Sequence, residues 1–460
     1  MIEEIVFGDR WVTAELPDDT VVVPPGVSIP LDPVEDIGAA VRAALDQPLD
    51  LPPLMEVARS RSRVLVAFDD PTVPCYAPVW AEALREVLKD LSAAGVREEN
   101  ISLLCANALH RQFTFDELRR LIGEEIADRF QGRLTCHDAE DSDGMVSIGQ
   151  TAGGYNVDLN RRVEDSDLVI YLNCSTTRGF SGGWKSICVG LSSYRSIAHH
   201  HDPETMSMSL SRNLMHEILD EMGELVIAAL GEDRFFKIET VLSNPLQVAK
   251  VFAGTVGATR RAALGVNRAH MTNRREMIEE KTDIVLYGVP DWSPYAAYSH
   301  TNPILTMIST GLGYLGGMIE ALGKPGCTAI LATPSPDRWD EQRHPSYREV
   351  WERVLPETKD PFEAKQRFEE EFATRSEYVD KYRNGFGFHG SHGIMALYPL
   401  KRLRHSSRVI VAGAEDPHIV EHAGFTHCKT VEDAISEAKS EQGSSASTAF
   451  VRYPPAMSRQ

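Results

Sequence analysis

The sequence predicts an α/β fold with two domains, each a largely parallel sheet covered by helices, and an active-site cleft between them. Short runs rich in β-branched residues alternate with longer helical patterns, which is typical of parallel sheets covered by helices. The chain has 460 residues, more than one hydrophobic core usually supports. A charged stretch at residues 268–281 precedes a new strand. We therefore predict an N-terminal domain over residues 1–275 and a C-terminal domain over residues 283–460, whose last segment is a candidate to pack back on the first domain.

The individual elements follow from hydrophobic spacing. Short apolar runs predict strands over residues 5–7, 63–68, 100–105, 133–137, 168–172, 283–288, 328–332 and 408–412. Apolar residues at helical spacing predict helices over residues 79–93, 114–130, 206–230 and 302–322. Thr114 followed by Glu117 fits a capping box at the start of the second helix. His110 and Arg111 are therefore expected in a loop between a strand and a helix.

Polar residues follow three of these predicted strands. Asp69 and Asp70 come after residues 63–68, His110 follows residues 100–105, and a polar run begins at Asn173 after residues 168–172. Ligands of parallel α/β sheets bind outside the carboxyl ends of the strands. We therefore expect the three loops to converge on one cleft.

Charge and composition exclude several classes of function. The formal net charge of −20 argues against a nucleic-acid binder, which needs clustered Lys and Arg to contact phosphates. The acidic N-terminus has no apolar signal core, and no run of about 20 apolar residues predicts a membrane span. The seven cysteines are scattered, odd in number and free of CxxC spacing, which indicates reduced thiols. We expect a cytoplasmic protein that binds neither nucleic acid nor membrane.

The segment at residues 173–201 carries the densest chemistry, NCSTTRGFSGGWKSICVGLSSYRSIAHHH. Glycines such as Gly182 and Gly183 let the backbone approach a bound group closely, and hydroxyls such as Ser181 and Ser186 can hydrogen-bond a phosphate or a ring substituent. A lone lysine is usually a solvated surface residue, whereas a lysine that bonds a cofactor needs a neutral amine close to it. Lys185 in these surroundings indicates a cofactor site.

The histidine triplet at residues 199–201 has two interpretations. The imidazoles can cap the end of a helix, or one of them can be a neutral metal ligand. Consecutive residues on a helix point about 100° apart, so at most one or two of the three can face one site. Elsewhere, the acidic neighbours of His137 and Asp138 suggest an exposed loop or a divalent-ion site, and we favour the exposed loop.

Three motifs together resemble the signature of the lactate racemase (LarA-type) family: DDPTVP at residues 69–74, HR at residues 110–111, and FSGGWKSI with a histidine sixteen residues after its lysine. The resemblance implies a nickel-pincer nucleotide, a pyridinium bisthiocarboxylic acid mononucleotide with nickel, bonded covalently to Lys185. It implies that His201 is the protein ligand to Ni and that His110 is a general base. Asp70 and Thr72 would help to position the cofactor, with His200 lining its pocket.

The chain departs from the family pattern at two positions. Val73 stands where the family has an arginine that pairs with a substrate carboxylate, and Ser175 stands where it has a second catalytic histidine. Arg178 or Arg111 is the candidate to engage the charged group of the substrate. The candidates for a replacement base are His199, His200 and His300.

The resemblance implies an isomerase, a racemase or epimerase of a 2-hydroxy acid or related hydroxylated substrate, working by hydride transfer to the cofactor. His110 would take the hydroxyl proton. Two alternatives stay open: a one-way redox or elimination enzyme that uses the same cofactor, and a low-turnover cofactor-binding protein. The implied partners are a small hydroxy-acid-like substrate and the enzymes that make the cofactor. The oligomeric state is not predicted.

Overall fold

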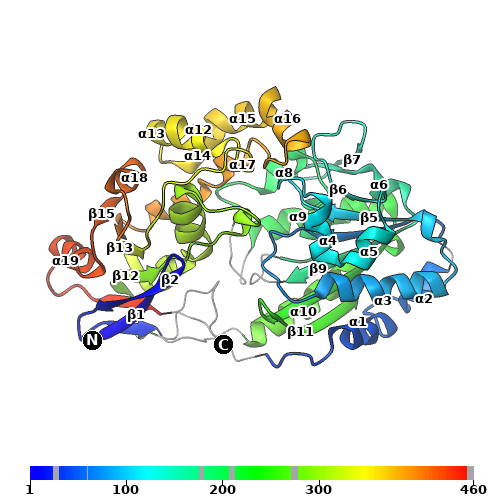
Figure 1. The fold of residues 1–460 in the computed structure, drawn as a ribbon, viewed down its shortest axis with the longest axis horizontal. Helices are drawn as coiled ribbons and strands as arrows, with labels where there is room; N and C mark the ends of the chain where they lie inside the picture. The colour runs from blue at the N-terminus through cyan, green and yellow to red at the C-terminus, as the bar shows by residue number, and fades with distance from the viewer. Residues whose placement is uncertain (24–30, 60, 176–180, 207–212, 271–277, 453–460) are drawn as a thin grey trace. The chain divides into compact units, whose positions relative to one another are not determined.

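The structure is a computed structural model, and it describes residues 1–23, 31–59, 61–175, 181–206, 213–270 and 278–452 (Figure 1). The chain divides into two compact units. The N-terminal unit comprises residues 30–270 and 379–388, and the C-terminal unit comprises residues 1–29, 271–378 and 389–460. Both are mixed α/β units built on a six-stranded sheet, as the sequence predicts.

The sheet of the N-terminal unit holds four of the predicted strands side by side. Its order is β11-β10-β9-β4-β5-β6, and only β11 runs antiparallel. β4 (Val64–Asp69) is buried along its whole length, which is expected for a central parallel strand covered on both faces. The other strands are β5 (Ile101–Ala106), β6 (Leu134–Cys136), β9 (Leu168–Ser175), β10 (Phe235–Asn244) and β11 (Gln247–Gly254).

Helices cover this sheet at positions close to the predicted ones. Helix α3 has the predicted bounds, Val79–Ala93. The helix predicted over residues 114–130 is two helices, because Gly123 at φ +90° interrupts it, and the capping box of Thr114 and Glu117 is present. The remaining elements are α1 (Ile37–Asp46), α2 (Leu54–Ala58), α4 (Phe115–Ile122), α5 (Glu124–Arg129), β7 (Met145–Gln150), β8 (Asn156–Asn160), α6 (Arg161–Asp165), α7 (Lys185–Cys188), α8 (Tyr194–His200), α9 (Leu214–Leu230) and α10 (Val256–His270).

The sheet of the C-terminal unit is parallel throughout, in the order β15-β14-β13-β12-β16-β3. Its core strands β12 (Thr282–Gly288), β13 (Gly323–Ala332) and β14 (Arg408–Ala412) were all predicted. β3 (Val21–Val23), β15 (Thr426–Cys428) and β16 (Thr448–Val451) complete the sheet, and β1 (Ile2–Phe7) and β2 (Arg10–Glu15) form a separate hairpin. The main helices of this unit are η5 (Ile304–Tyr314), α11 (Gly317–Leu322), α12 (Tyr347–Glu349), α13 (Leu355–Glu357), α14 (Pro361–Ala364), α15 (Glu370–Thr374), α17 (His392–Met395), α18 (Pro417–His422) and α19 (Val431–Gln442). Helix α16 (Ser376–Asn384) begins in this unit and ends in the N-terminal unit.

The predicted domain limits need a correction at both ends of the chain. Residues 1–29 belong with the C-terminal unit, because β3 pairs with β16 and Glu3 forms an ion pair with Arg452. Residues 379–388 belong with the N-terminal unit, where the hydroxyl of Tyr382 donates to the Ala108 carbonyl at 2.8 Å. The last strand, β16, pairs with β12 and β3 in the C-terminal sheet, and residues 453–460 of the predicted last segment lie outside the described residues.

One helical stretch meets the length and composition of a membrane span. Ile304–Leu322 has 19 residues, and 72% of its apolar part is buried within the protein. The sequence analysis discounted such a span. The burial of this stretch is what a core helix shows, and its π-type bond from Leu315 N to Thr310 O at 3.0 Å marks an irregular turn.

Candidate active site

The three strand-end loops predicted to converge do meet at the carboxyl ends of β9, β4 and β5. Asp69, the last residue of β4, accepts hydrogen bonds from the Tyr171 hydroxyl at 3.0 Å, the Asn173 amide at 2.8 Å and the Cys174 backbone N–H at 2.7 Å. Burial raises the pKa of Asp69 to about 6, although these donors and the cation of Lys237 oppose the shift. A buried carboxylate therefore ties β4 to β9 at the floor of the site.

His110 is paired with the next carboxylate along the chain. Its Nδ1 lies 2.8 Å from Oδ2 of Asp70, which is buried. The Thr72 hydroxyl donates to Oδ1 of Asp70 at 2.5 Å and lies 3.2 Å from Nδ1 of His110. A carboxylate at Nδ1 favours the tautomer with the proton on that nitrogen, which leaves the Nε2 lone pair to accept a proton. Asp70 and Thr72, predicted to position a cofactor, thus contact the predicted base.

The loop that carries His110 is fixed in an uncommon backbone conformation. Ala108 has φ +49°, a left-handed value that is rare for a residue with a side chain. Its N–H donates to the Gly190 carbonyl at 3.1 Å and its carbonyl accepts from Tyr382. The ring of Phe388 lies 5.6 Å from the ring of His110. The segment at residues 379–388 therefore supports the His110 loop.

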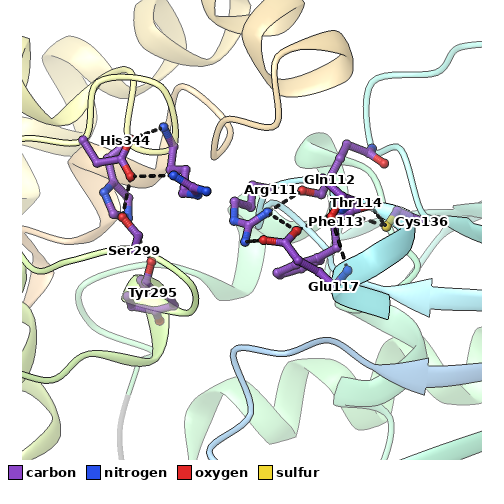
Figure 2. Close-up of polar contacts among 11 residues, drawn as sticks. Arg111, Gln112, Phe113, Thr114, Glu117, Cys136, Tyr295, Ser299 and His344 are labelled. Atoms are coloured by element: carbon purple, nitrogen blue, oxygen red, sulfur yellow. Dashed lines mark hydrogen bonds and ion pairs between the residues drawn. The ribbon is translucent and has the colours of Figure 1, made fainter. Parts of the chain in front are cut away.

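Arg111 is paired with the glutamate of the capping box. It is 1% exposed, and its guanidinium makes two hydrogen bonds to Glu117, from Nη1 to Oε2 at 2.9 Å and from Nη2 to Oε1 at 2.8 Å. Figure 2 shows the two groups facing each other, with Thr114 donating its backbone N–H to the same carboxylate. This buried, bidentate pair ties Arg111 to the capping box. The role of Arg111 toward the charged group of the substrate stays a prediction.

Lys185 begins helix α7 and is half-buried. Burial lowers the pKa of its amine to about 7, and the nearby cation of Arg260 lowers it further, while Asp69 and Asp70 act in the opposite direction. Near neutral pH a large fraction of this amine is therefore uncharged. An uncharged amine is what covalent attachment of a carbonyl-type group requires.

The glycines before Lys185 allow a close approach to neighbouring side chains of the protein, and their predicted approach to a bound group stays a prediction. Gly182 and Gly183 have φ values of +89° and +60°, which favour glycine. A Cβ on Gly182 would lie 2.1 Å from Oε1 of Glu239, and a Cβ on Gly183 would lie 3.2 Å from Cδ of Arg260. The close approach is thus to side chains of β10 and α10. The carbonyl of Ser181 also accepts a hydrogen bond from Arg260.

Two buried residues at this place were missed by the sequence analysis. Lys237, on β10, donates from Nζ to the Gly183 carbonyl at 2.8 Å and to the Ser186 hydroxyl at 2.6 Å. Glu239, two residues later, is fully buried, with Oε2 3.6 Å from the Lys237 amine. Their alternation with Ile238 and Thr240 was the only sequence signal, and it matches an ordinary strand with one solvated face.

The histidine triplet lies at the end of helix α8. His199 contacts β8, with Nε2 3.2 Å from the Asn156 amide nitrogen. His200 is fully buried, and its Nδ1 lies 2.8 Å from Nδ1 of His201, which is half-buried at the C-cap. Because one of these two nitrogens has to donate, the pair shares a single proton at this contact. A metal-ligand role for His201 would use its Nε2.

The residues proposed to replace missing family groups are placed as follows. Ser175 is buried at the end of β9, and its hydroxyl has no hydrogen-bond partner among the residues that the structure describes. His300 is exposed and lies in the C-terminal unit. Arg178 lies outside the described residues.

The C-terminal unit carries a polar cluster of its own, after the carboxyl ends of β12 and β13. The Ser299 hydroxyl donates to Oδ2 of Asp340 at 2.5 Å, and Nε2 of His344 lies 2.8 Å from the Tyr295 carbonyl (Figure 2). Burial raises the pKa of Asp340, but the hydrogen bonds from Ser299 and Arg343 outweigh it and lower the pKa to about 2. This carboxylate is therefore ionised.

Comparison with known proteins finds a family match for the N-terminal part of the chain. Residues 7–212, which include every site residue described above for the loops after β4, β5 and β9, match the lactate racemase N-terminal domain. This part of the chain is similar to the lactate racemase family. The lactate racemase of Lactiplantibacillus plantarum is 30% identical over 230 residues, and that of Thermoanaerobacterium thermosaccharolyticum is 25% identical over 223 residues.

The likeness to these lactate racemases differs between sequence and fold. The sequence matches cover 48% of this chain and 51% and 50% of the two relatives, so the chain spans about half the length of the curated relatives it matches. The lactate racemase apoprotein structure from T. thermosaccharolyticum superimposes with a TM-score of 0.68 at 19% identity, over 98% of both chains. The structure of a Thermotoga maritima protein superimposes with a TM-score of 0.52 at 13% identity, over 92% of this chain and 98% of that chain. Both structural matches show the two-unit α/β fold alone.

Proposed function

We propose that this protein is an isomerase of the lactate racemase family that uses a nickel-pincer nucleotide to racemise or epimerise a 2-hydroxy acid or a related hydroxylated substrate. The observation that carries the proposal is Lys185, whose half-buried amine has a pKa of about 7. Lys185 and the Asp70–His110 pair both lie within residues 7–212, the region that matches the lactate racemase N-terminal domain. A solvated surface lysine would not combine these properties.

The residues present fit such a cofactor in three respects. With a pKa of about 7, a substantial fraction of the Lys185 amine is uncharged at neutral pH, as covalent attachment needs. His201 is engaged through Nδ1, which orients the ring for a ligand role at Nε2. The hydroxyl of Ser175 is buried and lacks a hydrogen-bond partner within the described part of the chain, which is expected where a bound group completes a site. Among the described residues no cluster of three or more His, Cys, Asp or Glu could hold a metal by itself, consistent with a metal held largely by the cofactor.

When bound, the nucleotide supplies the acceptor for a hydride from the substrate carbon. The chain's own residues handle the proton. His110, with Nδ1 held by Asp70, accepts the hydroxyl proton at Nε2 and returns it later. Asp70 stabilises the imidazolium that forms, and the fixed loop around Ala108 keeps the ring in position. The proposed chemistry thus needs one oriented base on the described part of the N-terminal unit.

The replacement at Ser175 favours a second candidate function. The hydroxyl of Ser175 does not titrate near neutral pH. It therefore cannot act as the second base, the role of the second histidine in the family. A one-way redox or elimination enzyme that uses the same cofactor needs only one base, and His110 supplies it. The oriented Asp70–His110 pair argues against a protein that binds the cofactor with little turnover.

Attachment of the cofactor can be tested by intact mass. Protein produced together with the enzymes that make the nucleotide should carry a covalent adduct and about one nickel per chain, and Lys185→Met should carry no adduct. Lys250→Met, which changes an exposed lysine on β11, is the matched control and should load like the wild type. A wild-type chain without adduct and without nickel would contradict the proposal.

A further inference from the structure

The loop that carries Lys185 lies over the side chains of a buried lysine and a buried glutamate of β10. In the parallel pairing of β10 with β9, Lys237 is opposite Tyr171 and Glu239 is opposite Asn173. Residues two apart in a strand share one face of the sheet. Because Asp69 accepts from both Tyr171 and Asn173, this face presents a continuous row of polar groups under the loop.

Lys237 contacts the Lys185 turn on both sides of Lys185. One hydrogen bond goes to the Gly183 carbonyl at 2.8 Å and one to the Ser186 hydroxyl at 2.6 Å. Gly183 is two residues before Lys185 and Ser186 is the residue after it. The Lys237 ammonium thereby fixes the backbone just before Lys185 and the first turn of helix α7. These two parts set the direction of the Lys185 side chain.

Glu239 supplies the compensating charge. Both its carboxylate oxygens are buried and have no hydrogen-bond partner among the described residues, and the Lys237 amine is 3.6 Å away. Placing two charges out of water is costly, and packed apolar residues of similar volume would often be at least as stable. A buried pair of this kind is therefore explained better by what it positions than by the stability it adds.

We propose that Lys237, with Glu239 as its buried counter-ion, is the positioning residue that holds the Lys185 turn in the geometry needed for cofactor attachment. The inference rests on the proposed role of Lys185 and adds the residues that serve it. Among the described residues, the charges of Asp69 and Asp70 at the end of β4 and of Arg260 on α10 act on the Lys185 amine. Lys237 acts on the backbone of the turn.

The experiment measures the amine of Lys185 in the apoprotein. Acetylation of Lys185 by acetic anhydride is followed by peptide mass across pH, since only the uncharged amine reacts. In the wild type the reaction should rise with pH around a midpoint near 7, because the uncharged fraction grows as pH passes the pKa. The double variant Lys237→Met with Glu239→Gln removes both charges together, so that neither is left buried alone.

In this double variant the released turn should expose Lys185 to water, and the midpoint should rise by at least about one pH unit toward the ordinary lysine value near 10.4. Cofactor adduct in protein produced with the biosynthetic enzymes should fall about tenfold, since a rise of one unit changes the uncharged fraction by up to that factor. Lys250→Met, on the neighbouring strand β11, should leave both readouts unchanged.

Lys237→Arg is the second variant, in case the double variant does not fold. It keeps the ion pair with Glu239, but its planar fork cannot place one nitrogen against both acceptors, so a smaller rise of the midpoint is expected. A wild-type midpoint and wild-type adduct yield in a folded variant would overturn the inference. If the wild type itself takes up no adduct, the proposed function fails, and the apoprotein profile still decides the role of Lys237.

Discussion

Asp70→Asn should lower the turnover rate of the loaded enzyme by about 10²–10⁴-fold, the range expected when a positioned general base is lost. Asparagine can donate its amide N–H to Nδ1 of His110, where the carboxylate accepts at 2.8 Å in the wild type. The ring would then carry its proton on Nε2, which removes the lone pair that takes the substrate proton. Rate and nickel content are measured on the same preparation, so that loss of loading is separated from loss of chemistry.

His110→Gln should cause a loss of the same order, and the double variant should be little worse than either single variant, because residues that act as a unit are not additive. Asp116→Asn, at an exposed acid in the first turn of α4, is the control and should retain full activity. A loaded Asp70→Asn protein that keeps nearly wild-type turnover would show that Asp70 does not orient the base.

Arg111→Met should lower the free energy of unfolding by about 3–5 kcal/mol, because it leaves the carboxylate of Glu117 buried without its partner. Urea unfolding followed by circular dichroism measures the change. The double variant Arg111→Met with Glu117→Gln should recover part of the loss, since no charge then stays uncompensated.

Arg119→Met, on the same helix α4, offers a matched comparison. Its ion pair with Asp128 is more exposed, at 34% and 55% of the two side chains, so the expected loss is only about 0–1 kcal/mol. The account of Arg111 would be contradicted if Arg111→Met unfolded like the wild type but raised KM for a carboxylate substrate. That outcome would instead support the role that the HR motif suggests for Arg111.

Strand positions could be predicted from the sequence because each strand is a short local apolar run. All eight predicted strands are present, and α3 has the predicted bounds. The convergence of the loops at Asp69, His110 and Asn173 could also be predicted from the sequence, because it depends only on the shared direction of parallel strands. Local patterns were enough wherever the determining contacts were local.

Burial of charged and polar residues could not be predicted in the same way. His137 was expected in an exposed loop, yet it is fully buried, with Nε2 donating to the Ser192 carbonyl at 2.9 Å and the Asn160 amide donating to Nδ1 at 3.0 Å. Burial lowers the pKa of His137 to about 4. Its partners are 55 and 23 residues away, so the acidic neighbours in sequence gave the wrong indication.

The same limitation explains why β10 and β11 were missed. Lys237 and Glu239 alternate with apolar residues, as on a strand with one side in water, but the turn at Gly182 and Gly183 covers that side. Likewise, the sequence placed residues 1–29 in the nearer domain, whereas β3 pairs with β16 at the other end of the chain. Such pairings depend on the tertiary fold.

The most direct test of the account is the stereochemical course of the loaded wild-type enzyme on single-configuration hydroxy acids and related hydroxylated compounds, followed by chiral chromatography. The account predicts that the compound with the opposite configuration at the hydroxyl carbon accumulates until the two forms reach equilibrium, and that no ketone is released. It also predicts that His110→Ala abolishes this conversion. Accumulation of free ketone or of a dehydrated product, with no inverted compound, would contradict racemisation and establish the one-way alternative.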